Sequence, residues 1–585
     1  MVNIIRLTVK NKPTLPLNNC NKIRIALVSI PYGEGPQMMM PLGLMNISSF
    51  VTREVQNCII RIFDYSDLES NEFLEAHEVI AEWNPDLVGF TIYSSHIHVA
   101  VEWANAIKTL RPNCLLFCGG PHVSLDHIGF TKEWGNVFHL SIHGDGEFPV
   151  KTLAEFYLDE IHIQEGIKIK AENFLMKYFT KIPNAARLDG GKVIKSHYSA
   201  PQLKADQWAN PLLSDVYTKY NRSLTFSDRK TGKSRKAVAL TSSRGCPLNC
   251  SFCAIIIPDI GGERWRSMSS AQLVQWISEK YTIEPFEHVY LMDANFFVNP
   301  QRVREFSNLL YDKFKGNITW STTSTVKYIL KISEHLPELA QKGLRLIEIG
   351  IESGSQKQLN YFNKHVTVKE NIQAIKLLHK NDIMVFMDFI MFYPDQEPDE
   401  IRQNLIFLVN AKLTQLESFD HYTNILMLYP NTPVRLNKEV ELGIKFNPNT
   451  IPDSRNFIKN QSTKMIYECY IDNFAKEYIP KIKNAINNIQ ENLRNTESIN
   501  NISKFERIKL RLDIIFLRHI PFKILWDLLD ATNFSSLSMT SPNSKNHIAL
   551  IEKYSTLNPL QRKHEIFSEN RGRSGEITSN ERNNK

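Results

Sequence analysis

The sequence predicts an α/β protein: an N-terminal doubly wound, Rossmann-like sheet, then a partial (β/α)6 barrel of the TIM type, then a helical C-terminal region. Two stretches, about residues 22–160 and 237–437, alternate short apolar runs with helical patterns. In the C-terminal part, apolar residues recur at helical spacing. These three observations carry the prediction.

The chain of 585 residues is long enough for several domains. We divide it into an N-terminal extension (1–21), a first domain (22–160), a connector (161–236), a barrel domain (237–437), a helical C-terminal domain (438–562) and a disordered polar tail (563–585). Hydrophobic residues make up 42% and charged residues 22%, a profile typical of soluble globular proteins. The net charge of +7 is small beside 69 Lys and Arg, so nucleic-acid binding is not indicated.

Three absences indicate the compartment. No uncharged apolar stretch of about 18 residues is found, so no transmembrane helix is predicted. The N-terminus lacks the apolar core of a signal peptide. Eight cysteines, three of them clustered, do not resemble a disulfide framework in a chain of this length. We therefore expect a cytoplasmic, reduced protein.

Five apolar runs predict the strands of the first domain: Ile23–Ile30, Ile59–Tyr65, Leu87–Ser94, Cys114–Cys118 and Phe138–Ile142. Helical patterns between them include Leu42–Arg53, Phe73–Trp83 and Val99–Leu110. Ligands of such sheets bind beyond the carboxyl ends of the strands. The loops expected there are Pro31–Pro36, Ser94–His98, Gly119–His122 and Gly144–Glu147. Their glycines permit close approach to a ligand, whereas His96, His98 and His122 could equally be turn or cap residues, and Cys114 and Cys118 are interpreted as core thiols.

The connector is interpreted as an extended linker with a hairpin turn at Leu188–Lys192. Its basic residues Lys230, Lys233, Arg235 and Lys236 are expected on a solvated face rather than at a phosphate site.

Six apolar runs predict the barrel strands: Ala237–Leu240, His288–Met292, Ile318–Ser321, Leu344–Ile351, Ile383–Ile390 and His421–Leu428. The helical segments include Ser270–Tyr281, Arg302–Lys315, Val368–His379 and Asp399–Asn410. Active sites of such barrels lie at the C-terminal mouth of the strands.

Three cysteines, Cys246, Cys250 and Cys253, form a C-x3-C-x2-C pattern directly after the first barrel strand. Thiolates hold iron–sulfur clusters, and a [4Fe–4S] cluster normally takes four. No fourth cysteine lies nearby, so three would leave one iron open to a small ligand. The alternative, zinc, would require a fourth Cys or His close by, and the next downstream candidate is His288.

This cysteine pattern, with the aromatic Phe252 before its last member, resembles the signature of the radical S-adenosylmethionine superfamily. The resemblance implies that the open iron binds the amino and carboxylate groups of S-adenosylmethionine, whose reductive cleavage releases a 5′-deoxyadenosyl radical. Further matches are Arg264–Ser267, Asp293–Phe296, Ile349–Gly354 and Asn363-Lys364.

The same resemblance implies that Phe252, Asp293 and Glu352 contribute to the S-adenosylmethionine site, although Glu352 could equally form a buried ion pair. Relatives carry glycines where this chain has Phe392–Glu397 and Asn431, so the rim of the pocket is expected to differ. Asn431 can still adopt a left-handed turn.

The loops of the first domain resemble the cobalamin-binding domain of cobalamin-dependent radical S-adenosylmethionine enzymes. The matching elements are Pro41–Leu44, V-G-F-T-I-Y-S-S, G-G-P-H and G-D-G-E. The D-x-H-x-x-G motif, which supplies a lower axial histidine, is absent, as in family members that hold the cofactor without one. The resemblance implies contacts to the nucleotide tail of cobalamin from Thr91, Ser94, Gly119, Gly120, Pro121 and His122.

The family resemblance implies a [4Fe–4S] cluster, S-adenosylmethionine and cobalamin as cofactors, with flavodoxin or ferredoxin as an external electron donor. The function we expect is methylation of an unreactive carbon (or phosphinate) centre in a small metabolite, natural product or peptide. Alternatives are a radical cyclisation, rearrangement or oxidation, and a non-catalytic cobalamin or redox sensor. A tRNA methylthiotransferase is disfavoured, because no second cysteine-rich cluster precedes the triad.

The C-terminal domain carries helical patterns at Lys464–Arg494 and Lys504–Leu529, the latter both apolar and basic. A helical cap on the barrel is expected, with an amphipathic surface for a membrane or an apolar substrate as the alternative. Pro521 is expected to break or kink its helix. Cys469 is a candidate radical relay, and no catalytic acid or base is assigned.

Overall fold

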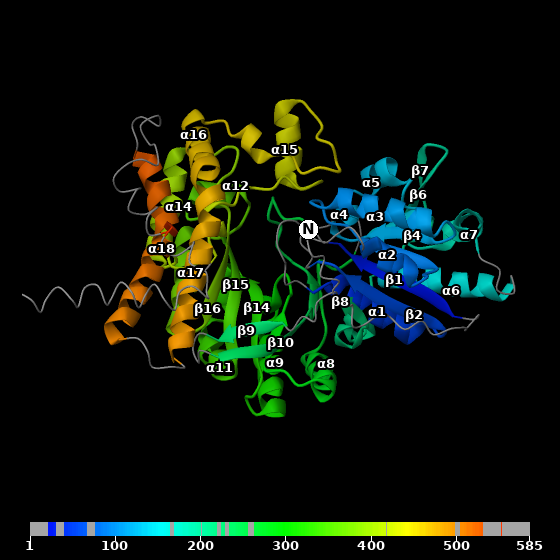
Figure 1. Cartoon of the computed structure of the whole chain (residues 1–585), viewed down its shortest axis with the longest axis horizontal. Helices are drawn as coiled ribbons and strands as arrows, with labels where there is room; N and C mark the ends of the chain where they lie inside the picture. The colour runs from blue at the N-terminus through cyan, green and yellow to red at the C-terminus, as the bar shows by residue number, and fades with distance from the viewer. Residues whose placement is uncertain are drawn as a thin grey trace, which may run out of the picture.

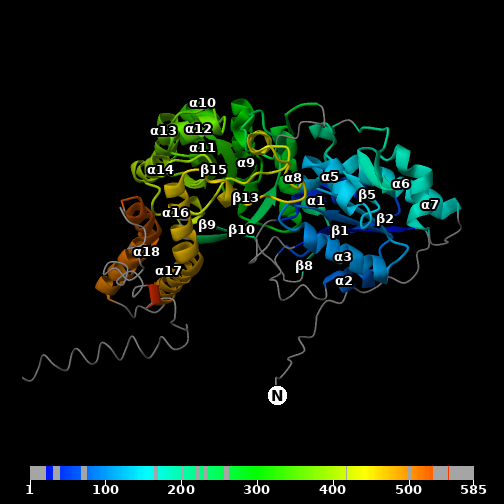
Figure 2. The same cartoon turned by 90° about the horizontal axis from the view of Figure 1, so that it is seen from above.

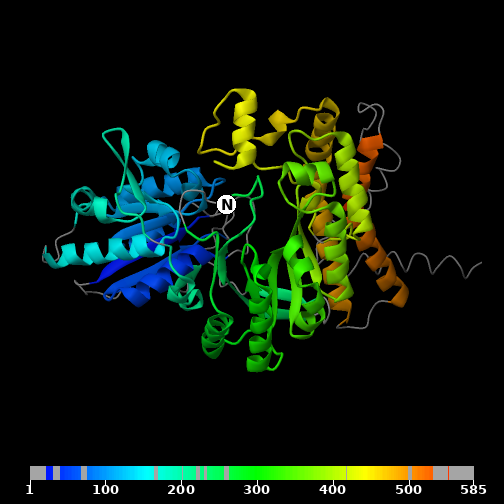
Figure 3. The same ribbon diagram turned by 180° about the vertical axis from the view of Figure 1, so that it is seen from behind.

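The computed structural model describes residues 22–30, 40–66, 76–163, 169–200, 202–218, 224–228, 233–255, 262–416, 418–497, 503–530 and 551–552. Two α/β units lie side by side, and a group of C-terminal helices covers the barrel unit on the side away from the first unit (Figures 1 and 3). The N-terminal extension, the loop Pro31–Pro36 and the tail 563–585 lie outside the described residues.

The first unit confirms all five predicted strands as a parallel array: β1 (Ile23–Ser29), β2 (Cys58–Asp64), β3 (Leu87–Thr91), β4 (Leu115–Gly119) and β5 (Leu140–Ile142). The helices are α1 (Leu42–Glu54), α2 (Ala76–Glu82), α3 (Ile97–Leu110), α4 (Pro121–Leu125), α5 (His127–Trp134) and α6 (Glu147–Ile163). Alternate residues of β1 face opposite ways, so Ile25 and Leu27 join the core beneath α1 and α6, whereas Ala26 and Val28 join the core beneath α2 and α3. Burial on both faces explains why the run is continuously apolar.

The connector is more than a linker, which corrects the sequence interpretation. The hairpin β6 (Ala185–Asp189) and β7 (Lys192–Lys195) extends the first sheet beyond β5, and β8 (Val216–Thr218) pairs with β2 at the opposite edge. A further strand, β9 (Thr225–Asp228), pairs antiparallel with the first barrel strand. These strands are short and partly polar, so only the glycine turn between β6 and β7 signalled them.

The basic stretch beside β9 is partly paired. Arg235 forms an ion pair with the buried Asp228 at 3.1 Å, whereas Lys233 and Lys236 are exposed. Lys230 lies outside the described residues.

The barrel unit contains a curled six-stranded sheet in the order β16-β15-β14-β13-β10-β9. Figure 2 shows this unit from above, beside the first unit. Its parallel strands are β10 (Lys233–Leu240), β13 (His288–Leu291), β14 (Thr319–Thr325), β15 (Leu344–Glu352) and β16 (Met384–Phe389). A small antiparallel ribbon, β11 (Ser243–Gly245) and β12 (Trp265–Ser267), follows β10. The helices are α8 (Ser270–Ile283), α9 (Pro300–Phe314), α10 (Val326–Lys331), α11 (Leu336–Gln341), α12 (Gln356–Tyr361), α13 (Val368–Lys380) and α14 (Pro398–Asn410).

The sixth predicted barrel strand, His421–Leu428, is wrong as a strand. Residues Asp420–Tyr422 form a 3₁₀ turn, and the segment pairs with the chain after β16 through one isolated bridge, Phe392 to Ile425. Its apolar residues, such as Tyr422 and Leu428, are buried nonetheless. Burial, rather than strand pairing, therefore accounts for the apolar pattern.

The C-terminal helices are α15 (Pro433–Leu442), α16 (Gln461–Tyr470), a π-helical turn (Ile471–Ala475), α17 (Lys476–Glu497) and α18 (Lys504–Asp530). Helix α18 packs on α14, α16 and α17, which confirms the helical cap. Pro521 lies inside α18 without breaking it. Within the described ranges, no helix combines the length and the apolar character needed to cross a membrane.

Candidate active site

The three cysteines lie in the loop after the ribbon strand β11, at the carboxyl end of the barrel sheet. Cys250 is buried, and Cys246 and Cys253 are half-buried. The loop is held by its backbone, since Ser251 N–H donates to the carbonyl of Phe362 at 2.9 Å. The amide of Asn295 reaches the Sγ of Cys246 at 3.8 Å. Burial raises the pKa of the Cys250 thiol to about 11, the Lys364 ammonium opposes this shift, and Glu352 and the other two thiols add to it.

The geometry distinguishes a cluster from a single zinc ion. Among the described residues, no three His, Cys, Asp or Glu side chains are close enough together to share one metal ion. The ligands of a single zinc ion must converge on one point, so this finding speaks against the zinc alternative. The suggested zinc ligand His288 is committed elsewhere, because its two ring nitrogens lie 2.8 Å from the hydroxyls of Thr319 and Ser321.

A buried ion pair lies beside the cysteine loop. Glu352 ends β15 with φ of +64°, and its Oε1 accepts from Lys364 Nζ at 2.7 Å. Burial opposes the charged form of Lys364, but Glu352 and Cys250 outweigh it, so the pKa of Lys364 is raised. Phe252 lies close by, with Lys364 Nζ 5.8 Å from its ring centroid. The structure thus brings together Phe252, Glu352 and the predicted Asn363-Lys364 element, and both readings of Glu352 stay open.

Asp293, expected at the S-adenosylmethionine site, has a structural role in the chain before the cysteines. Its carboxylate is 1% exposed and accepts from the backbone N–H and hydroxyl groups of Ser242 and Ser243, at 2.5–3.2 Å. Both oxygens are therefore occupied, and the side chain orders the chain just before the cysteines instead of presenting a free acceptor. Asn295, from the same motif, is the residue that reaches a cysteine.

Two further carboxyl groups, Glu348 and Asp388, share a hydrogen bond on the concave face of the barrel sheet. Glu348 also accepts from the Thr323 hydroxyl at 3.3 Å. Burial, followed by repulsion from Glu352 and Glu348, raises the pKa of Asp388 to about 8. Asp388 therefore holds a proton at neutral pH. No motif in the sequence indicated this pair, although both residues lie on predicted strands.

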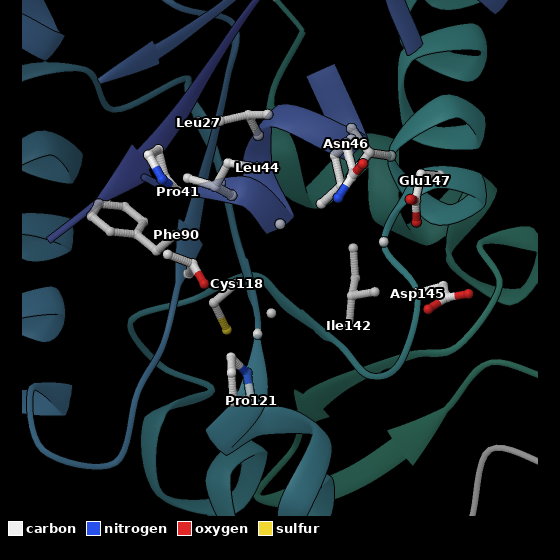
Figure 4. A pocket seen from close by; sticks show the side chains of 18 of the residues that line it. Leu27, Pro41, Leu44, Asn46, Phe90, Cys118, Pro121, Ile142, Asp145 and Glu147 are labelled. Atoms are coloured by element: carbon white, nitrogen blue, oxygen red, sulfur yellow. The ribbon is translucent and has the colours of Figure 1, made fainter. Parts of the chain in front are cut away.

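The first unit contains a cavity of about 320 Å³ at the carboxyl ends of its strands (Figure 4). Its size falls in the range of small-molecule sites. The lining includes four of the predicted residues, Thr91, Gly119, Gly120 and Pro121, together with Asn46 and Cys118. Figure 4 shows Pro121, Asn46 and Cys118 around the cavity. A Cβ on Gly120, which has φ of +100°, would lie 2.7 Å from Thr91 Oγ1, so only glycine fits this turn.

Ser94 and His122 do not line this cavity. His122 is fully buried, with Nδ1 2.7 Å from Ser94 Oγ and Nε2 3.3 Å from Asn449 Oδ1 beyond α15. Burial lowers its pKa, so the ring stays neutral at physiological pH. Among the described lining residues there is no histidine, which fits a cobalamin held without a protein ligand on its lower face.

The cavity extends to the barrel unit. Thr241 and Arg244, which lie between β10 and Cys246, line it together with Asp145 and Glu147 of the G-D-G-E loop. The wall of the cavity in the first unit is thus continuous with the cysteine loop of the barrel unit. Sequence reasoning assigned no role to Arg244, Asn46 or Thr241, because each lies outside a cofactor motif.

The rim segment Phe392–Glu397, which was expected to differ from the family pattern, is tied down by ion pairs. Asp395 pairs with Lys438 at 3.2 Å and with Lys459 at 2.5 Å. These cations come from the segments after the barrel, so the rim is tied to the C-terminal unit. Asn431 keeps a left-handed turn with φ of +58°.

Comparisons with known proteins agree with these two sites. Residues 240–408 match the radical SAM superfamily, and residues 33–153 match the B12 binding domain. An uncharacterized methyltransferase of Pyrococcus horikoshii is 24% identical over 455 residues, which cover 76% of this chain and 88% of the relative. The anaerobic magnesium-protoporphyrin IX monomethyl ester cyclase of Cereibacter sphaeroides is 25% identical over 350 residues, 58% of this chain and about half (52%) of the cyclase.

A solved structure has the same fold. The cobalamin-dependent S-adenosylmethionine radical enzyme OxsB, with aqua-cobalamin bound, superposes with a TM-score of 0.62 at 17% identity. The superposition covers 91% of this chain and 76% of OxsB.

Proposed function

We propose that this chain, which belongs to the cobalamin-dependent radical S-adenosylmethionine enzymes, transfers a methyl group from methylcobalamin to an unactivated carbon (or phosphinate) centre. Its cofactors are a [4Fe–4S] cluster, S-adenosylmethionine and cobalamin. The observation that carries the proposal is the shared wall, since Thr241 and Arg244 line the cavity of the first unit and lead into the cysteine loop. The substrate we propose is a small metabolite, natural product or peptide.

Each set of residues has a distinct part in this proposal. Cys246, Cys250 and Cys253 would hold the cluster, and the Glu352–Lys364 pair with Phe252 would shape the S-adenosylmethionine site beside it. Thr91, Gly119, Gly120 and Pro121 would receive the nucleotide tail of cobalamin. Bound together, the cofactors supply a radical able to abstract hydrogen and a methyl group to place on the resulting centre. The chain itself orients these groups and excludes water.

The test is an anaerobic assay of the reconstituted enzyme with methyl-labelled S-adenosylmethionine, hydroxocobalamin, a chemical reductant and a small-molecule extract of the source cells. We expect labelled methyl on cobalamin and a labelled product that is heavier than its precursor by one CH2 unit. Unlabelled S-adenosylhomocysteine and 5′-deoxyadenosine should form as coproducts. A Cys250→Ser variant is the matched control and should form neither 5′-deoxyadenosine nor product. Steady formation of 5′-deoxyadenosine without label in any product would refute methyl transfer.

A second candidate is a radical cyclisation or oxidation on the same scaffold, favoured by the similarity to a cyclase. The same assay separates the two, because the product of a cyclisation loses hydrogen and gains no carbon.

We also propose that the enzyme works in the cytoplasm with flavodoxin or ferredoxin as electron donor. The reducible cluster needs an electron from a donor, and flavodoxins and ferredoxins carry single electrons. Purified flavodoxin should replace the chemical reductant in the assay, and failure of both donors would contradict this partner.

An anionic membrane surface is the partner that we propose for helix α18. Phe505, Ile508, Leu512, Ile515 and Phe516 recur at helical spacing and are each at least 45% exposed. Lys504, Arg507, Lys509 and Arg511 flank them. Apolar side chains among cations suit anionic headgroups. Sedimentation with phosphatidylglycerol vesicles should exceed that with phosphatidylcholine, and a Phe505→Ser/Leu512→Ser variant should lose it. A dimer in solution that the same variant dissolves would identify a second copy as the partner instead.

A further inference from the structure

An ion cluster of one buried and three half-buried side chains joins the two units next to the cysteine loop. Arg244 and Arg266 come from the ribbon β11/β12, Asp145 comes from the loop between β5 and α6, and Glu147 is the first residue of α6. Asp145 Oδ1 lies 3.3 Å from Arg244 Nη1, and its Oδ2 lies 2.8 Å from Arg266 Nη1. Arg244 Nη2 donates to Glu147 Oε1 at 2.5 Å. Each residue of the first unit thus has a cationic partner in the second.

The ribbon needs this anion. Arg244 and Arg266 are directly opposite each other in the antiparallel pairing, a position at which like charges repel. Asp145 offsets the repulsion because each of its oxygens binds one guanidinium. Burial alone would raise the pKa of Asp145, but the two arginines outweigh it and hold that pKa below its ordinary value. The Trp208 ring lies beneath Arg244, with the guanidinium carbon 4.6 Å from the centroid, and completes the enclosure.

The backbone on both sides is shaped for this contact. Gly144 has φ of +76°, and a Cβ on Gly146 would lie 2.6 Å from Ile47 Cδ1 on α1. Gly245, between Arg244 and Cys246, has φ of +80°, and its Cβ would lie 2.1 Å from the carbonyl oxygen of Arg264. A side chain at position 245 would meet the backbone of Arg264, so the turn between Arg244 and Cys246 requires glycine. The cluster is therefore a built junction rather than an incidental surface pair.

We propose that Asp145 is a positioning residue that fixes the cysteine loop against the wall of the first unit's cavity. The inference rests on the proposed function, because it assumes cobalamin in that cavity and a cluster on that loop. Arg244 is two residues before Cys246 and itself lines the cavity, so the ion cluster connects the cysteine loop directly to the cavity wall. The separation of cobalt and cluster is set by this contact.

The test is an Asp145→Asn substitution in the full chain. Asparagine keeps the shape, but it loses the charge and offers a donor group to one arginine. In the cofactor-free protein, amide exchange in 243–245 and 265–267 should accelerate about tenfold or more, the factor for loss of about 1.4 kcal/mol, near the lower bound for a charged hydrogen bond. In the protein loaded with cob(II)alamin and reduced cluster, pulsed EPR should show a broader distribution of the distance between the two paramagnets.

Controls separate positioning from folding. Asp215→Asn removes the partner of Arg61 at 3.0 Å on the outer edge of the first sheet, and it should leave both measurements unchanged. Asp145→Glu keeps the carboxylate and should restore much of the protection. Arg266→Lys provides a second route if Asp145→Asn does not fold, and it should also broaden the distances.

Unchanged exchange and an unchanged distance distribution in Asp145→Asn and Arg266→Lys would overturn the proposal. Both readouts are independent of methyl transfer, so a chain that fails the methylation assay but shows these effects would refute only the proposed function.

Discussion

Replacing Lys364 by methionine separates the two roles considered for Glu352. The ammonium and the carboxylate are 2.7 Å apart, and their side chains are only 5% and 8% exposed. A Cβ on Gly350 would come within 3 Å of both charged groups, so the backbone is adapted to this pair. Removing one partner of a buried pair leaves the other uncompensated, which costs about 3–5 kcal/mol. We expect Lys364→Met to reduce the free energy of unfolding by that amount.

The double variant Glu352→Gln/Lys364→Met removes both charges, so most of the loss should return. The coupling free energy of the cycle should reach about 2–3 kcal/mol. Urea unfolding of the cofactor-free variants, with amide exchange of β15 as the local probe, measures it. Lys476→Met, at the start of α17, breaks an exposed pair with Asp472 of the π-helical turn, should cost less than about 1 kcal/mol and is the control. Coupling below about 0.5 kcal/mol would refute the structural reasoning.

The same double variant tests the S-adenosylmethionine role. If Glu352 contacts the cofactor, the refolded double variant should bind S-adenosylmethionine at least about tenfold more weakly, the effect of losing one charged hydrogen bond. If the double variant binds S-adenosylmethionine as tightly as the wild-type protein, Glu352 has only the structural role of an ion-pair partner.

Three shorter predictions concern other sites. Because the folded pKa of Asp388 is raised to about 8, stability should fall as pH rises from about 4 to 8, and Asp388→Asn should flatten this slope by about 1 kcal/mol or more. Burial lowers the pKa of His288 to about 3, so the free energy of unfolding should decrease as pH falls from about 6.5 toward 3, because only the unfolded state takes up a proton on this ring. His288→Gln should make the free energy of unfolding less dependent on pH in that range, as measured by acid unfolding. Gly120→Ala should reduce the free energy of unfolding by about 1–3 kcal/mol, because φ is positive there and the added Cβ would meet Thr91. Gly43→Ala, whose Cβ would point into open space, is the control and should leave the thermal unfolding temperature nearly unchanged. Equal losses of stability in the two variants would contradict this reasoning.

The parallel strands could be predicted because their sequence pattern has a single physical cause. Ile25–Val28 is covered on both faces, so every residue of the run must be apolar. His421–Leu428 shows the limit of that pattern, since a buried irregular segment is apolar for the same reason without having a strand partner. The connector strands show the converse. β6 and β8 are short, and they pair with β5 and β2, strands that lie about 45 and 150 residues earlier, so their own composition could not reveal the pairing.

The site could be predicted to the level of loops but not of side-chain directions. The positions of Thr91 and Gly119–Pro121 follow from strand ends alone, and they line the cavity. His122 is in the same loop, yet its ring turns to Asn449, a partner more than 300 residues away that no local spacing could indicate. Asp293 is similar, because its carboxylate accepts hydrogen bonds from four groups of Ser242 and Ser243, and the motif alone did not indicate these partners.

The relation between the two cofactor sites depends on contacts of this distant kind. On one side of the cavity, Asp145 binds the ribbon that leads into the cysteines. Beyond α4, Asn431 donates to the carbonyl of Leu125 at 2.5 Å and Asn449 meets His122, and both asparagines flank α15, which lies over the junction in Figure 1. The segments before the first cysteine and after the last barrel helix therefore hold the same unit from two directions. A displacement of either contact would change the angle between the sites as well as their distance, so loss of the charged contact alone should leave the units attached but less precisely aligned.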